Sequence, residues 1–151
     1  MRFPPGLQHA IANTHLFTDA EHYVILHLPL SQYEEAAHLI SNHNTPFTAL
    51  VRDKDEVTVL ISREYWEMSR PKIETLEESP DYRLITFDLP LELGLVGYLA
   101  ALAGAVAEKG VSIFTISAFS RDHIFVPTED FEQAWDALRT LIRSCQTEEK
   151  N

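Results

Sequence analysis

The second half of the chain carries the pattern that most constrains the fold, an amphipathic helix between two apolar strands. Residues 82–89 favour the extended state and end at Pro90. Residues 94–109 then place apolar side chains at helical spacing, namely Leu95, Leu99, Leu102, Ala103 and Val106. Gly110 stands where a glycine commonly ends a helix, and residues 111–119 form a nearly continuous apolar run, typical of a strand covered on both faces. This segment therefore predicts a strand, a helix and a second strand.

The same order of elements is predicted in both halves of the chain. In the second half, a turn at residues 120–122 leads into a strand at 123–126 and a final helix from 129 to about 144. The first half is predicted to form a strand, a helix and a hairpin over residues 21–28, 31–40, 47–52 and 57–61. The order strand, helix, strand, strand is that of ferredoxin-like units. We therefore expect an α+β fold of two ferredoxin-like (βαββαβ) modules, with antiparallel sheets packed against helices.

Residues 71–80 are charged and contain two prolines, a composition typical of a linker. We therefore expect an N-terminal module at 1–70, a linker at 71–80 and a C-terminal module at 81–145. The first twenty residues show no clear period, and the Pro-Pro-Gly sequence at 4–6 predicts an irregular start.

Composition excludes several classes of function. No apolar run approaches the roughly 20 residues needed to cross a bilayer, and the N-terminus lacks the apolar core of a signal peptide. We therefore expect a cytoplasmic protein that does not bind membranes. The formal net charge of -11 would repel a phosphate backbone, which argues against nucleic-acid binding. The single cysteine, Cys145, cannot form an internal disulfide.

Motifs of common enzyme classes are missing from the sequence. The seven histidines form no HExxH pattern, and the chain has no GxSxG sequence and no P-loop. We therefore expect no catalytic residues, no metal site and no cofactor.

Three segments in order resemble the ACT family. Residues 93–102 (LGLVGYLAAL) are similar to the start of the first ACT helix, and residues 107–114 (AEKGVSIF) resemble the exit from it. Residues 117–126 (SAFSRDHIFV) resemble the hairpin of a subgroup that includes small bacterial tandem-ACT proteins and the CASTOR arginine sensors. The specific match covers about residues 82–138, and the first half fits by layout only. The resemblance implies a tandem ACT protein that binds an amino acid as a regulator, with aspartokinase regulatory domains as more distant relatives.

A ligand site is expected at the start of the predicted helix. Unpaired N–H groups at a helix N-terminus attract a carboxylate, which assigns this role to Gly94, Leu95, Val96 and Gly97. The alternative is that the two glycines serve only a turn and helix packing. The resemblance assigns the ligand ammonium to Asp122, whose alternative role is to hydrogen-bond its own turn.

Five further residues surround this expected site. Ala118 and Phe119 belong to the hairpin, Glu92 could reach a basic side chain, and Thr48 would lie on the opposite wall if the modules pack side by side. Arg121 could pair with Asp122 or with an acidic ligand, and its alternative role is that of a solvated surface charge. Ala118 and Arg121 replace two threonines that are usual in the family.

We therefore expect a non-catalytic sensor of a free amino acid. Its partners would be that amino acid, a regulated protein and a second copy of the chain in a homodimer. The alternative is a ligand-free ACT module that serves protein interaction.

Overall fold

The computed structural model describes residues 3–41, 47–69 and 72–151. It confirms the expected α+β class, with antiparallel strand pairs and helices. The chain divides into two compact units, which are described separately below. One unit comprises Ala20–Tyr82, and the other joins Met1–Asp19 with Arg83–Asn151.

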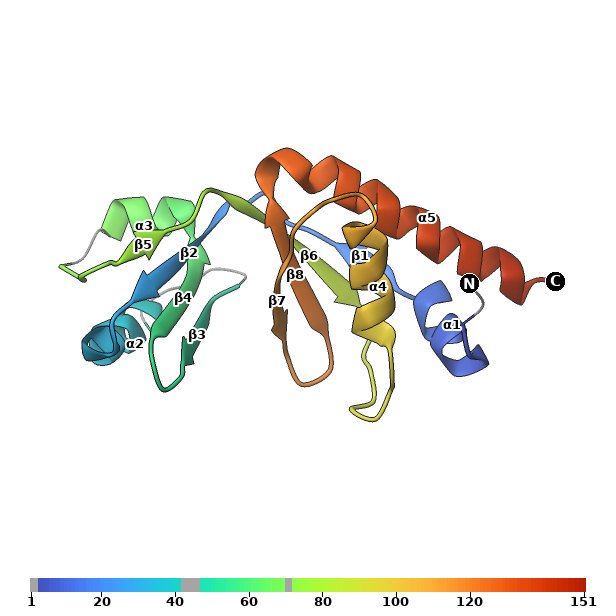
Figure 1. The fold of residues 1–151 in the computed structure, drawn as a ribbon, viewed down its shortest axis with the longest axis horizontal. Coiled ribbons are helices and arrows are strands. Elements are labelled where there is room, and N and C mark those ends of the chain that lie inside the picture. Colours follow the sequence, from blue (N-terminus) through green and yellow to red (C-terminus); the bar gives the residue numbers. More distant parts are fainter. Residues whose placement is uncertain (1–2, 42–46, 70–71) are drawn as a thin grey trace. The chain divides into compact units, whose positions relative to one another are not determined.

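The unit formed by Ala20–Tyr82 has the order strand, helix, strand, strand, helix, strand (Figure 1). Its elements are β2 (Tyr23–Leu28), the 3-10 turn η1 (Leu30–Gln32), α2 (Tyr33–Ser41), β3 (Ala49–Arg52), β4 (Val57–Ser62), α3 (Arg63–Ser69) and β5 (Glu77–Glu78). The strands lie in the order β3, β4, β2, β5, and each neighbouring pair is antiparallel. The core contains alternate residues of β2 and β4 together with Ala36, Leu39 and Trp66.

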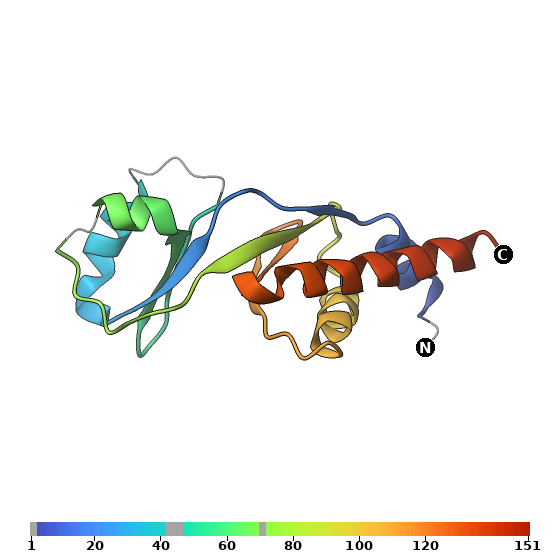
Figure 2. The same ribbon diagram turned by 90° about the horizontal axis from the view of Figure 1, so that it is seen from above.

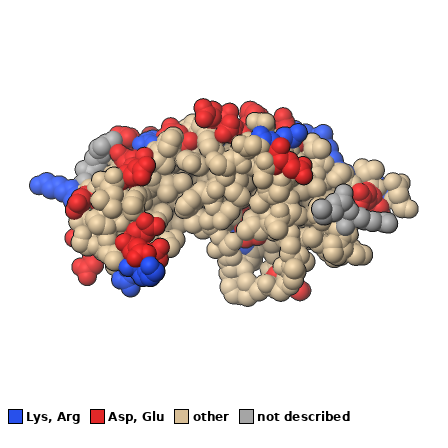
Figure 3. All heavy atoms as spheres, viewed as in Figure 1, with Lys and Arg blue, Asp and Glu red and all other residues tan. Residues whose placement is uncertain are grey.

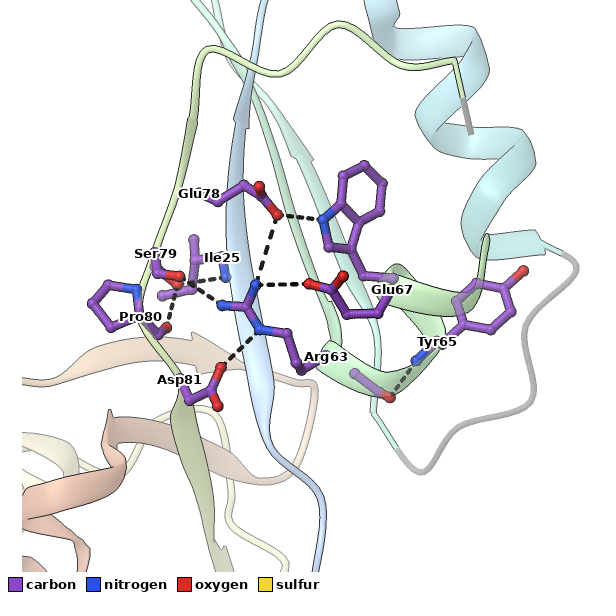
Figure 4. Close-up of polar contacts among 10 residues, drawn as sticks. Ile25, Arg63, Tyr65, Glu67, Glu78, Ser79, Pro80 and Asp81 are labelled. Atoms are coloured by element: carbon purple, nitrogen blue, oxygen red, sulfur yellow. Dashed lines mark hydrogen bonds and ion pairs between the residues drawn. The ribbon is translucent and has the colours of Figure 1, made fainter. Parts of the chain in front are cut away.

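The segment expected to be a linker is an integral part of this unit. Arg63, the first residue of α3, donates from Nε to Asp81 Oδ1 at 2.7 Å and from Nη2 to the Ser79 carbonyl at 2.7 Å (Figure 4). The Trp66 indole N–H donates to the Glu78 carboxylate. These bonds join α3 to the end of the segment, and β5 within it pairs with β2.

The second unit combines both ends of the chain. Its elements are α1 (Pro5–Ala12), β1 (His15–Phe17), β6 (Tyr82–Asp88), α4 (Tyr98–Ala107), β7 (Phe114–Ser117), β8 (Asp122–Pro127), the 3-10 turn η2 (Thr128–Asp130) and α5 (Phe131–Glu149). The strands lie in the order β1, β6, β8, β7, and β1 pairs antiparallel with β6. Figure 2 shows α1 beside the C-terminal end of α5, where the Gln146 side chain donates to the Ala12 carbonyl at 2.9 Å.

The compact units therefore differ from the expected boundaries at 1–70, 71–80 and 81–145. Residues 3–19 pack with the C-terminal half because Ile11 and its neighbours on α1 join the core of α4 and α5. The irregular start predicted from the Pro-Pro-Gly sequence is wrong. Pro5 occupies the first turn of α1, where its missing N–H breaks no helical bond.

The bounds of two helices differ from the prediction. Helix α4 begins at Tyr98 rather than Gly94, because Gly97 has φ +87° and a left-handed residue interrupts the helix. Helix α5 continues to Glu149, five residues beyond the predicted end at Ser144.

Candidate functional site

A cavity of about 280 Å³ lies in the second unit, between the loop before α4, the start of α4 and the β7–β8 hairpin. Figure 3 shows a hollow on the lower side of this unit, with atoms of acidic and basic side chains visible at it. The cavity is lined by residues of the three elements, namely Leu91, Glu92, Leu93, Leu95, Gly97, Tyr98, Leu99, Ala100 and residues 117–122.

The structure brings most of the predicted site residues together here. The lining includes Glu92, Leu95, Gly97, Ala118, Phe119 and Asp122. Gly94 and Val96 lie in the same loop but do not line the cavity, and Val96 is 83% exposed. Thr48 belongs to the other compact unit, so its part in a ligand site stays a prediction.

The start of α4 forms part of the wall of this cavity. Gly97 precedes the helix, accepts from the Ala101 N–H at 2.9 Å and supplies no side-chain cap. The first N–H groups of a helix have no acceptor within it, and the residues that carry them here, Tyr98, Leu99 and Ala100, line the cavity. The donors therefore lie about one turn later than the predicted stretch at Gly94–Gly97.

Asp122 is the first residue of β8 and lies on the cavity wall. Its Oδ1 accepts from the Ser117 hydroxyl at 2.6 Å. The turn itself closes through the backbone, where the Ala118 N–H donates to the Arg121 carbonyl at 2.9 Å. Asp122 is thus hydrogen-bonded to a side chain across the hairpin, whereas the alternative role required a bond to its own turn.

The hairpin of the other unit contains an aspartate that does hydrogen-bond its own turn. Asp53 Oδ1 accepts from the N–H groups of Asp55 and Glu56 at 2.8 and 2.9 Å. These backbone bonds hold the pKa of the Asp53 carboxyl below its ordinary value. Asp53 therefore shapes its turn.

Arg121 forms an ion pair with Asp88, the last residue of β6. Its Nε lies 2.8 Å from Asp88 Oδ1, and both side chains are partly exposed. Arg121 was predicted to pair with Asp122 or with an acidic ligand. Its partner in the structure is Asp88 instead. The neighbouring His123 lies 2.8 Å from the Thr86 hydroxyl through Nδ1, and burial lowers the pKa of its ring.

Sequence reasoning missed the support behind the site, which comes from the N-terminal segment. The Tyr98 hydroxyl lies 2.6 Å from Thr14 Oγ1. The Thr14 hydroxyl in turn donates to the Ala10 carbonyl of α1 at 2.8 Å. Burial raises the pKa of Tyr98 to about 12, the bond to Thr14 acts against this rise, and the charge of Asp122 adds to it. Tyr98 lies within a predicted helix, but no sequence signal pairs it with Thr14.

Among residues 3–41, 47–69 and 72–151, no group of three histidine, cysteine, aspartate or glutamate side chains could hold a metal ion. None of the helices in these residues is both long and apolar enough to span a membrane.

Comparison with known proteins shows a likeness to the ACT domain family in this part of the chain. Residues 77–140 match the ACT domain family model, and they contain the hairpin and most of the cavity wall. No curated protein matches the chain.

Solved structures support the same fold. A Vibrio cholerae protein of unknown function, described as a possible transport protein, is 28% identical with a TM-score of 0.67, covering 90% of this chain and 95% of that one. An Agrobacterium tumefaciens protein is 21% identical with a TM-score of 0.69, covering 85% and 89%. The ligand-free regulatory subunit of aspartate kinase from Thermus thermophilus is 16% identical with a TM-score of 0.60, covering 83% and 95%. At the two lower identities the likeness is one of fold alone.

Proposed function

We propose that this chain is a non-catalytic regulatory protein that binds a free amino acid in the cavity between α4 and the β7–β8 hairpin. The observation that carries the proposal is the position of Asp122. Its carboxylate shares one cavity with the first turn of α4, and the turn backbone is closed without it. A negative group and a set of N–H donors on one cavity are the complement of an ammonium and a carboxylate on one carbon.

The proposed ligand binds through both ends of its backbone. Its carboxylate accepts from the N–H groups of Tyr98, Leu99 and Ala100, helped by the positive end of the helix dipole. Its ammonium donates to Asp122, whose second oxygen is available beside the bond from Ser117. The ACT domain at residues 77–140 and the fold shared with a regulatory subunit of aspartate kinase support this regulatory role.

The unit of Ala20–Tyr82 offers no matching arrangement at its own hairpin. There Asp53 is held by its turn, and the Arg52 guanidinium lies over the Tyr33 ring at 4.2 Å. We therefore place the ligand in the second unit alone, while a contact from Thr48 remains a prediction. The tandem ACT arrangement, a closer relation to CASTOR-type sensors, a cytoplasmic location, a homodimer and a regulated partner belong to this proposal.

The second candidate function is a ligand-free ACT module that serves protein interaction. Three large apolar side chains around the cavity favour it, since Leu93, Val96 and Phe119 are 76%, 83% and 82% exposed. Ala118 also offers no hydroxyl to a ligand.

A thermal-shift screen against the twenty amino acids separates the two functions. A ligand at about 100 times its Kd should stabilise the fold by about 2.7 kcal/mol. Asp122→Asn should abolish the shift, because the amide keeps the size of the side chain but loses its charge. Asp53→Asn is the matched control at the other hairpin and should keep the shift. A flat screen of folded protein, or full binding by Asp122→Asn, would contradict the proposal.

A further inference from the structure

We infer that the cavity selects an amino acid with an apolar side chain over one with an acidic or basic side chain. This inference rests on the proposed function and concerns only the end of the ligand that points away from Asp122 and the start of α4. Three observations carry it: the chemistry of the cavity walls, the pairing of Arg121 and the size of the cavity.

Both walls available to a ligand side chain carry apolar residues. With Asp122 and the first turn of α4 engaged by the ligand backbone, the apolar part of the remaining wall is formed by Leu91, Leu93 and Leu95 on the loop and Ala118 and Phe119 on the hairpin. The polar part of that wall is formed by Glu92, Ser117, Ser120 and Arg121. Leu93 and Phe119 are 76% and 82% exposed, so an apolar ligand would remove part of their surface from water. These two side chains give an apolar ligand a gain in free energy that a polar one does not receive.

The charges on the cavity disfavour an acidic side chain. Glu92 and Asp122 are both carboxylates in the lining, and the cation of the lining, Arg121, already lies 2.8 Å from Asp88. A ligand carboxylate would have to share Arg121 with Asp88 while facing Glu92 and Asp122. This repulsion would be strongest at low ionic strength.

A basic side chain gains less from the same site. Its one candidate partner on the loop, Glu92, is exposed, and exposed ion pairs contribute little because water screens them. The ammonium or guanidinium group would also lie against leucine and phenylalanine side chains and lose part of its hydration.

The volume is sufficient for a single amino acid. At about 280 Å³ the cavity lies just below the roughly 300–1,000 Å³ that pockets for drug-sized molecules span. A side chain of the size of leucine, methionine or phenylalanine uses this space, whereas glycine leaves the apolar walls without a contact.

Titration calorimetry of the full chain with leucine, phenylalanine, glycine, glutamate and lysine tests the inference. We expect the better of the two apolar ligands to bind at least tenfold more tightly than glutamate, lysine or glycine. Phe119→Ser should weaken binding of that ligand severalfold and should leave the fold intact, because the ring is 82% exposed. Met68→Ser is the matched control, since Met68 is 79% exposed on the other unit and should not affect binding.

A second variant tests the role of the ion pair. Asp88→Asn removes the carboxylate that engages Arg121 and should raise the affinity for glutamate severalfold relative to leucine. Tightest binding of glutamate or lysine by the natural chain would overturn this inference but keep the proposed function. Binding of none of the five ligands would overturn this inference, and a flat screen of all twenty amino acids would overturn the proposed function as well.

Discussion

The Tyr98 hydroxyl at the start of α4 lies 2.6 Å from Thr14 Oγ1, which is 84 residues earlier in the chain. Both side chains are buried, and the Thr14 hydroxyl also bonds to the last turn of α1. The helix that begins at the candidate ligand site is therefore held in place by the N-terminal segment.

Tyr98→Phe should lower the free energy of unfolding by about 1 kcal/mol, because it removes one buried hydrogen bond and leaves the ring in place. Urea unfolding measures this change. A double-mutant cycle with Thr14→Val is the control, since the two losses should not be additive if the bond exists. Full additivity would contradict it.

The same residue predicts a loss of stability at alkaline pH. The pKa of Tyr98 is raised from 10.0 to about 12 in the folded chain, chiefly because burial favours the neutral phenol. A pKa that is higher in the folded state gives a contribution to stability that is complete below pH 10 and is lost as the pH rises through 10 toward 12. Unfolding free energies between pH 9 and about 12 should fall more steeply for the natural chain than for Tyr98→Phe. Equal slopes would contradict the shift.

Gly97→Ala should destabilise the second unit by about 1–3 kcal/mol, because φ +87° strains any residue with a Cβ. The added Cβ would also lie 3.3 Å from Leu7 Cδ2 of α1. Gly104→Ala is the matched control within α4, where a Cβ meets open space, and it should stabilise the helix by about 0.5–1 kcal/mol. Thermal melts of both variants should move in opposite directions, and a Gly97→Ala protein as stable as the natural chain would refute the strain.

Ile11→Ala should cost about 2–5 kcal/mol, although Ile11 lies far outside the ACT match at residues 77–140. The side chain is fully buried in the core that α1 shares with α4 and α5. Met68→Ala, at an exposed position, should change stability by less than about 0.5 kcal/mol. Equal stability of the two variants in urea would mean that α1 is not part of the folded unit.

Local patterns predicted much of the fold. The hairpin predicted at residues 47–52 and 57–61 corresponds to β3 and β4, and the final helix predicted from residue 129 corresponds to α5. The cavity is lined by Gly97, Asp122 and other residues that were predicted to lie at one site. These features depend on residues that are close together in the sequence.

Only the tertiary structure shows which strands pair and which distant side chains are in contact. The pairing of β1 with β6, the bond between Tyr98 and Thr14 and the ion pair of Arg121 with Asp88 each join residues distant in sequence. Periodicity reports which face of an element is apolar, but it does not identify the element that covers that face. The sequence by itself therefore determined the elements of the second half and the carboxylate at the hairpin. The fold determined that the N-terminal segment supports this site and that Arg121 is already paired.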